Sequence, residues 1–234
     1  MEKFRRVMLK LSGEALAKKE GGFDIDEIRK IAEEVKAVHG AGTDVGIVIG
    51  GGNFWRGRTG TEIERSKSDS IGMLATVMNC IYVSEIFRGA GLETAIMTPF
   101  ECGTMSELFS LDKANEYFRE GKVIFFAGGT GHPYFSTDMA VALRAVEIGA
   151  DCILSAKAVN GVYDKDPAKY PDAKKYDRLS FSEVVEKKLQ VVDLASSVLC
   201  MENKMPMRLF SLKEENSILK ALGDDFDGTE ITAD

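Results

Sequence analysis

The sequence predicts an α/β protein built around a mostly parallel sheet, as one continuous domain of 234 residues. Short β-branched apolar runs, Gly-rich or polar turns and longer segments with helical spacing alternate from end to end, which is typical of parallel strands joined by helices. No internal repeat, low-complexity tract or Pro/Ser/Gly-rich linker interrupts this order. Apolar residues make up 44% of the chain, enough for a substantial core.

The strands are predicted where β-branched and aromatic residues are concentrated. They lie at residues 5–11, 45–50, 93–97, 122–128, 151–156 and 207–212, with a short edge strand at 229–232. Ligands of an open parallel sheet bind beyond the carboxyl ends of its strands. The loops after these runs are therefore where a functional site is expected.

Helical spacing predicts the segments between the strands. The first helix follows Asp24, which resembles a capping box with Glu27, and ends at the GAG of residues 40–42. The segment 70–91 is apolar on more than one side and is expected to be buried on both, either within the chain or at a subunit interface. Further helices are expected at 137–150, 180–189, 194–204 and 214–222.

Charge and composition exclude several classes of function. Thirty basic against thirty-seven acidic residues give a net charge of −7, so no basic field is present to hold nucleic acid or an anionic membrane. No stretch is expected to be long and apolar enough to span a bilayer, and a cytoplasmic location is predicted.

Cysteine and histidine are sparse. The four cysteines show no CxxC pair and no neighbouring histidine, so they are predicted to be buried thiols and no metal ligand is assigned. Two histidines leave little room for His-based acid–base chemistry, and His39 is expected to be structural.

Four loops that follow strands have an unusual composition. They read KLSGE (10–14), GGGNFWRG (50–57), AGGTGHPYFSTD (127–138) and KAVNGVYDKDP (157–167). Three of them combine glycine with hydroxyl or amide side chains, which suits backbone N–H groups that bind phosphate oxygens. The glycines would let the backbone approach an anion, and Lys10 and Arg56 would add positive charge.

Standard nucleotide signatures are absent. The chain has no GxxxxGK[ST] motif, and GGGNFW breaks the GxGxxG spacing at its last position. Each glycine cluster taken singly could equally be a tight turn between a strand and a helix.

Five motifs in the same order as in a known family resolve this ambiguity. KLSGE, IGGGNFWRG (49–57), GMLATVMN (72–79) preceded by Asp69, GTGHPYFSTD (129–138) and NGVYDKDP (160–167) together resemble the bacterial uridylate kinases (UMP kinases) of the amino acid kinase family. The resemblance covers essentially the whole chain.

The resemblance implies a three-layer α/β/α sandwich around a mostly parallel sheet. It also implies an enzyme that reversibly transfers a phosphoryl group from ATP to UMP in de novo pyrimidine nucleotide biosynthesis, with GTP as activator and UTP as inhibitor. The expected assembly is a homohexamer. Roughly residues 1–150 would bind the acceptor and residues 151–234 would bind ATP.

The same resemblance assigns the site residues. The catalytic set would be Lys10, Arg56 and Asp138. The ATP-binding set would be Lys10, Leu11, Ser12, Gly13, Gly52, Arg56, Lys157, Tyr163 and Asp166. The UMP-binding set would be Gly51, Asp69, Thr130, Gly131, His132, Pro133, Tyr134, Phe135, Ser136 and Thr137.

Structural explanations compete with some of these assignments. An unpaired ammonium at the end of a buried strand is costly, which favours a functional Lys10. Asp138 could instead only cap the helix that follows it, and Tyr163 could be an ordinary turn aromatic. At Lys157 and Ala158 relatives vary, so the residue that contacts ATP there stays open, and His132 stands where some relatives have Asn.

The implied mechanism needs no general base. The second phosphate pKa of a nucleoside monophosphate is about 6, so the attacking oxygen is already mostly deprotonated at neutral pH. Lys10 would bridge the β- and γ-phosphates of ATP, Asp138 would hold its ammonium, and Arg56 would restrain the acceptor phosphate. Mg²⁺ is expected to accompany ATP, because the loops offer too little positive charge for both substrates.

Two other functions stay open from the sequence. One is a kinase for a carboxylate such as acetylglutamate or aspartate, against which Arg56, Asp69 and the TGHPYFST run argue. The other is a non-catalytic nucleotide sensor that uses the same loops, against which Lys10 and Asp138 argue weakly.

Overall fold

A nine-stranded sheet forms the middle layer of the molecule in the computed structural model, which describes residues 4–18, 20–55, 62–189 and 192–233. The strand order is β4-β3-β5-β2-β1-β6-β10-β11-β9. The bounds are β1 Arg6–Leu11, β2 Asp44–Ile49, β3 Thr94–Thr98, β4 Glu107–Leu108, β5 Val123–Phe126, β6 Cys152–Lys157, β9 Arg178–Ser180, β10 Met207–Ser211 and β11 Thr229–Thr232. Pairing is parallel except between β10 and β11.

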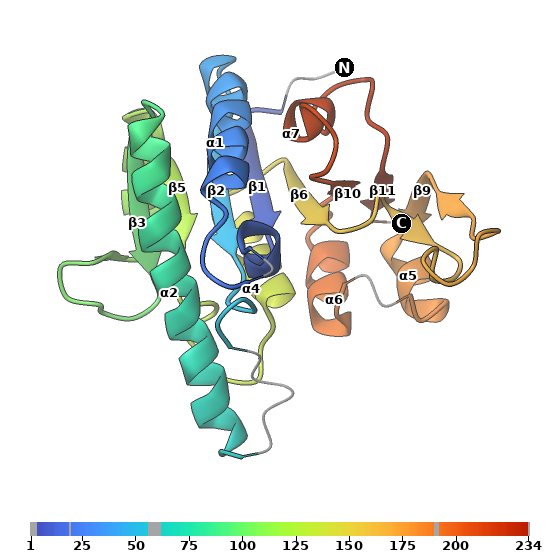
Figure 1. Cartoon of the computed structure of the whole chain (residues 1–234), viewed down its shortest axis with the longest axis horizontal. Coiled ribbons are helices and arrows are strands. Elements are labelled where there is room, and N and C mark those ends of the chain that lie inside the picture. Colours follow the sequence, from blue (N-terminus) through green and yellow to red (C-terminus); the bar gives the residue numbers. More distant parts are fainter. Residues whose placement is uncertain (1–3, 19, 56–61, 190–191, 234) are drawn as a thin grey trace.

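Helices cover both faces of this sheet and complete three layers (Figure 1). The bounds are α1 Ile25–Gly40, α2 Arg65–Gly89, α3 Leu111–Arg119, α4 Thr137–Glu147, α5 Phe181–Glu186, α6 Leu194–Glu202 and α7 Ser217–Lys220, with a 3₁₀ turn, η1, at Gly13–Leu16. Helices α1, α2 and α7 share one apolar cluster with the sheet, and α3, α4, α5 and α6 share the other. The predicted α/β class with a mostly parallel sheet is confirmed.

The alternation along β1 separates the two clusters. Val7, Leu9 and Leu11 belong to the cluster of α1 and α2, whereas Met8 belongs to that of α4. Because successive side chains of a strand point to opposite faces, Lys10 shares the face of Met8 and lies on the α4 side.

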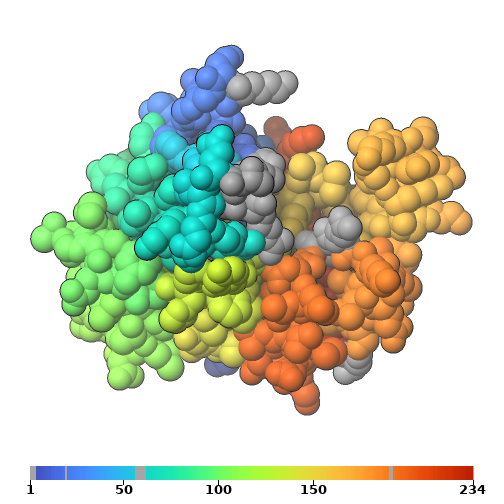
Figure 2. Space-filling model, turned by 90° about the horizontal axis from the view of Figure 1, so that it is seen from below, coloured from blue at the N-terminus to red at the C-terminus, as the bar shows by residue number. Residues whose placement is uncertain are grey.

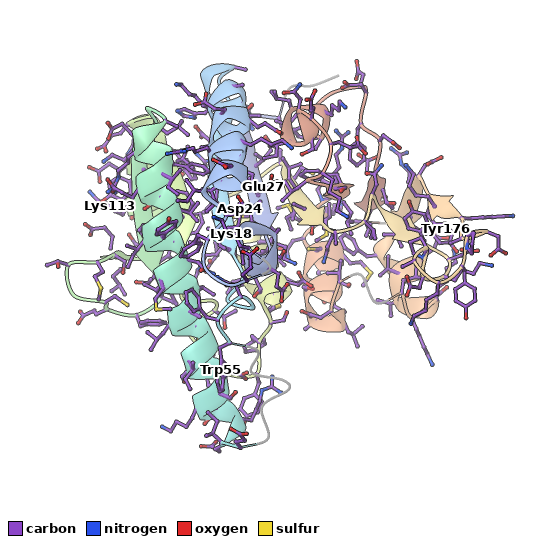
Figure 3. The ribbon with its side chains drawn as sticks, viewed as in Figure 1. Lys18, Asp24, Glu27, Trp55, Lys113 and Tyr176 are labelled. Carbon is purple, nitrogen blue, oxygen red and sulfur yellow. The ribbon has the colours of Figure 1, made fainter. Side chains whose placement is uncertain are left out.

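Helix α1 begins and ends where its sequence predicts. The Asp24 carboxylate accepts a hydrogen bond from the Glu27 backbone N–H at 3.2 Å, and both residues lie at the start of the helix (Figure 3). This is one half of the expected capping box. The apolar residues of one face, Ile28, Ile31, Val35 and Val38, are buried. Gly42 then takes a positive φ of 90° and ends the helical path.

Helix α2 differs from its prediction in two ways. It begins at Arg65, five residues earlier than expected, and only one of its sides is covered by the chain. Of the two alternatives for burial on both sides, burial within the chain is wrong, because the outward side chains Ile71, Leu74, Met78, Ile81 and Tyr82 are exposed. Of the described residues, Phe23 reaches one border of that side, where its ring stacks on Tyr82.

The same helix also qualifies by length and composition as a membrane span, contrary to the expectation that no segment does. Its best 18-residue window has a mean hydropathy of 1.4. Of that window, 44% is buried inside the structure, against β2, β3, β5 and α1.

Short elements account for most other differences. Helix α3, the strands β4 and β9, and a small separate hairpin of β7 (Val162–Tyr163) and β8 (Lys175–Tyr176) were not predicted. Two- and three-residue strands are too short to show alternation. The strand at 229–232 is not at the edge as predicted, because β9 pairs with its outer side.

The cysteines are free thiols and mostly buried, as predicted. Cys80, Cys152 and Cys200 are buried and Cys102 is half-buried. Burial raises the pKa of each of the three buried thiols to about 12, so they stay protonated at neutral pH.

Candidate active site

The predicted loops meet at one edge of the sheet, beyond the carboxyl ends of the strands. Seen from that edge, the start of α2 (cyan) lies beside the loop that precedes α4 and α4 itself (yellow-green) (Figure 2). The first half of α2 extends past the ends of the strands (Figure 1) and forms one side of the site.

A cavity of about 440 Å³ opens there. Sites for small molecules typically measure about 300–1,000 Å³. Eight of the predicted acceptor or ATP residues line it: Gly51, Gly52, Asp69, Thr130, His132, Phe135, Ser136 and Thr137. Seven lining residues were not assigned from the sequence: Glu14, Trp55, Arg65, Gly72, Met73, Thr76 and Gly129.

Two lysines meet one carboxylate beside this cavity. Lys10, which is 9% exposed, places its Nζ 2.8 Å from Asp138 Oδ1, and Lys157 Nζ lies 3.9 Å from the same oxygen. Lys157 ends β6, where Ile153 belongs to the α4-side cluster, so alternation brings Lys157 to the α4 side as well. Asp138 is in the first turn of α4, where the helix dipole favours a negative charge.

The charge state of Lys157 is poised near physiological pH. Burial, followed by the nearby positive charge of Lys10, lowers the pKa of Lys157 from 10.5 to about 8, while Asp138 opposes the shift. Groups with strongly shifted pKa values are concentrated at functional sites. The sequence pointed to Lys157 only through the resemblance, because its distance from Lys10 along the chain hides the contact.

The glycine-rich loop after β2 is fastened to α2 by side-chain amides. The buried Asn79 donates from Nδ2 to the Gly50 carbonyl and to Asn53 Oδ1, both at 2.8 Å, and its own Oδ1 accepts from Asn53 at 3.0 Å. The indole N–H of Trp55 donates to Ser68 Oγ at 2.8 Å, and Trp55 lies beside the first turns of α2 (Figure 3).

Packing explains the glycines of these loops more fully than the sequence did. A Cβ on Gly51 would lie 2.7 Å from the Gly72 carbonyl oxygen, and one on Gly13 would lie 2.5 Å from the Gly50 carbonyl oxygen. A Cβ on Gly52 would lie 2.5 Å from Glu14 Oε1. Close contact between protein segments therefore accounts for glycine at these positions, a reason that the sequence analysis did not anticipate.

The loop between β5 and α4 contains several residues with left-handed backbone conformations. Gly128, Gly129 and Gly131 all have positive φ, and so does Tyr134 at 73°. The Gly128 N–H donates to Thr76 Oγ1 at 2.8 Å, which ties the start of the loop to α2. Gly131, Pro133 and Tyr134 belong to this loop but do not line the cavity.

The end of this loop is also bonded to α6. Ser136 caps α4 by accepting from the Met139 N–H at 3.1 Å, and its hydroxyl donates to the Asp193 carboxylate. Asp193 in turn caps α6 by accepting from the Ser196 N–H at 2.9 Å. One chain of hydrogen bonds thus connects the cavity to a helix of the C-terminal third.

The remaining ATP residues predicted by the resemblance lie outside the cavity lining. The Leu11 side chain is in the core, and Ser12 caps η1 by accepting from the Ala15 N–H at 3.2 Å. Tyr163 is half-buried in β7, and Asp166 follows it, accepting from the Ala168 N–H at 3.0 Å. Their hairpin stands at one side of the molecule (Figure 2).

Two further points complete the placement of the predicted residues. Arg56 lies outside the described residues. Among the described residues, no group of three or more His, Cys, Asp or Glu side chains gathers in a way that could hold a metal ion.

Fold and site together define an α/β protein with a small-molecule-sized cavity at the carboxyl edge of a mostly parallel sheet, beside two lysines held by one aspartate. The model of the amino acid kinase family matches residues 5–211. The chain belongs to the amino acid kinase family.

Solved structures agree with this membership over the full length of the chain. The crystal structure of UMP kinase from Bacillus anthracis is 33% identical, with a TM-score of 0.95, and covers 100% of this chain and 98% of its own. The crystal structure of UMP kinase from Ureaplasma parvum is 30% identical, with a TM-score of 0.93, and covers 99% and 100%. The resemblance stated from five motifs is confirmed, and so is the sandwich architecture that it implied.

Proposed function

We propose that this chain transfers the γ-phosphoryl group of ATP to UMP, reversibly, giving UDP and ADP in pyrimidine nucleotide biosynthesis. The observation that carries the proposal is the pair Lys10 and Lys157 on Asp138, beside a cavity that can hold a nucleotide. Two solved structures of the same fold, at 33% and 30% identity, are of UMP kinases.

The roles follow from where charge moves in the reaction. A phosphate oxygen of UMP attacks the γ-phosphorus, and the bond to the β–γ bridging oxygen breaks. Lys10 meets the charge that develops on the leaving oxygen, with Asp138 holding its ammonium. The acceptor arrives deprotonated, so no side chain has to remove a proton.

The two substrates divide the chain between them. UMP occupies the cavity, with Asp69 and the loop residues 130–137 around it, in the part that spans roughly residues 1–150. ATP lies against Lys10, Leu11, Ser12, Gly13 and Gly52 at its phosphates and against Lys157, Tyr163 and Asp166 from residues 151–234. Arg56 restrains the acceptor phosphate.

ATP enters as its Mg²⁺ complex. The phosphate oxygens of ATP would hold this hard cation, and its charge would supplement that of Lys10 and Lys157. It is a companion of the substrate, and within the part of the chain that the structure describes no acidic cluster forms a cage for it.

The assembly and its control extend the proposal. The exposed apolar residues of α2, spaced as Ile71, Leu74, Met78 and Ile81, form one stripe on the helix, which suits a second copy of the chain. We assign this stripe to a subunit interface of a cytoplasmic homohexamer. GTP activates the assembly and UTP inhibits it.

A panel of acceptors tests the proposal. ADP release is measured with UMP, CMP, AMP, acetylglutamate and aspartate, each with ATP and Mg²⁺. We expect turnover with UMP well above that with the others. Turnover with a carboxylate acceptor alone would replace UMP in the proposal, and binding of nucleotides with no turnover would identify a sensor.

A further inference from the structure

Three residues meet at the mouth of the cavity and fasten its outer wall. Asp69 Oδ2 accepts hydrogen bonds from Arg65 Nε at 2.8 Å and from the Tyr134 backbone N–H at 2.7 Å. The Arg65 guanidinium also lies over the Tyr134 ring, 5.5 Å from its centroid. Arg65 and Asp69 are one turn apart on α2, whereas Tyr134 belongs to the loop before α4.

Tyr134 needs such contacts because of its backbone. Its φ of 73° is in the left-handed region, which is strained for a residue other than glycine because of its Cβ. Its side chain is 64% exposed, so burial offers little compensation. The bond to Asp69 and the cation over the ring hold this conformation.

The position of Tyr134 determines the wall of the cavity. It is followed by Phe135, Ser136 and Thr137, which all line the cavity, and Ser136 begins α4 as its cap. Release of Tyr134 would let these residues move away from Asp69, which lines the same cavity from α2.

Arg65, which itself lines the cavity, is the third residue of this cluster. Its side chain is 37% exposed, and its partner Asp69 is 12% exposed, so the ion pair is only partly screened by solvent. The planar guanidinium bonds Asp69 through Nε and presents its face to the Tyr134 ring, so that one rigid group fixes the direction of both contacts, whereas an ammonium is a compact point charge on a flexible stem.

We infer that Arg65 is a positioning residue for the acceptor: it holds Asp69 and Tyr134 together so that loop 130–137 is already in place when UMP enters. This inference rests on the proposed function. Arg65 would act on binding and not on the transfer step, so its loss should raise KM for UMP and leave kcat and KM for ATP nearly unchanged.

The test compares Arg65→Gln and Arg65→Lys with Arg29→Gln. Arg29 forms a solvent-exposed ion pair with Asp26 on α1 and serves as the matched control. We expect KM for UMP to rise roughly tenfold in Arg65→Gln, as for the loss of one charge-assisted hydrogen bond, and less in Arg65→Lys. Arg29→Gln should match the wild type.

A second readout measures binding without turnover. Trp55 is the only tryptophan and lines the cavity, so its fluorescence follows UMP titration in the absence of ATP. The apparent Kd for UMP should rise by the same factor as KM, while the melting temperature stays at the wild-type value. A second substitution, Tyr134→Asn in the Arg65→Gln background, should recover part of the affinity, because Asn tolerates positive φ.

The outcomes separate the two proposals. If the wild-type chain turns over UMP and Arg65→Gln keeps its KM and Kd, the inference is wrong and the proposed function stands. A fall in kcat with unchanged KM would also overturn it, since Arg65 would then act in the transfer step. If the wild-type chain neither binds nor phosphorylates UMP, the proposed function fails first.

Discussion

Lys10 shows how a single charged residue is kept in a nearly buried place. It is the penultimate residue of β1, and its ammonium is paired with Asp138 at 2.8 Å. Ser136, and not Asp138, is the residue that caps α4. The alternative that Asp138 serves only as a helix cap is therefore wrong. Asp138 is therefore available to orient the lysine.

Lys10→Ala is expected to lower kcat by about 10²-fold or more, as for the removal of one preorganised charge donor. Steady-state ADP release with UMP and ATP measures it. The control is Lys113→Ala, which removes an exposed lysine of α3 paired with Glu116 and should keep the wild-type kcat. A wild-type kcat in Lys10→Ala would refute the role given to Lys10.

Lys157 predicts a pH dependence. Its pKa of about 8 means that the ammonium is present below pH 8 and lost above it, so kcat/KM for ATP should fall as pH rises through about 8. In Lys157→Arg the charge persists, and the fall should move to much higher pH. A pH profile of initial rates checks this, and an identical fall in both proteins would contradict it.

The same shift has a consequence for stability. Between about pH 8 and 10.5 the unfolded chain keeps the Lys157 proton and the folded chain does not. Stability from this group therefore rises with pH over that window, because the cost of burying the charge disappears.

At the scale of elements, α2 organises the site. Asn79 holds the loop after β2, Thr76 holds the loop after β5, and Asp69 holds Tyr134. All three side chains come from one helix, so the two loops keep a fixed relation to each other. The packing of α2 on the sheet therefore also fixes the geometry of the site.

Gly51 and Gly52 give a matched pair of substitutions. Gly51→Ala forces the Cβ against a backbone oxygen of α2, at 2.7 Å, and should reduce the free energy of unfolding by about 1–3 kcal/mol. Gly52→Ala meets only the end of the Glu14 side chain, which can turn away, so its loss should be smaller. Urea unfolding measures both, and equal losses would show that the helix contact is not the cause.

At the scale of the whole molecule, the outward apolar side of α2 is exposed in a single copy of the chain. Its apolar residues recur at helical spacing, and Leu74 is 54% and Met78 47% exposed. Exposed apolar stripes of this kind are typical of protein interfaces.

Leu74→Glu is expected to break the assembly, because it places a charge in the middle of the stripe. Sedimentation velocity should show oligomers for the wild type and smaller species for the variant. Val185→Glu, on α5 in the other helical layer, is the control and should keep the wild-type size. A wild-type chain that sediments as a monomer would contradict the interface.

Much of the fold could be predicted because its signals are local. Each predicted β-branched run became a strand and each predicted helical pattern became a helix, with the cap of α1 at Asp24 as expected. Apart from the nine-residue helix α3, which was missed, the failures are of two kinds. Elements of two or three residues have no period, and the apolar outer side of α2 gave no sign of what covers it.

By itself, the sequence determined the order of strands and helices, the loops that carry the site, and the family, since each depends on residues that are neighbours along the chain. Only the tertiary structure decided that Lys10 and Lys157 share Asp138, that glycine at 51 is required by α2, and that Arg65 fastens Tyr134 through Asp69. Hydrophobic patterning specifies which side of an element is buried, but it does not specify its neighbour. Contacts between distant segments follow from the strand order and the packing of helices on the sheet.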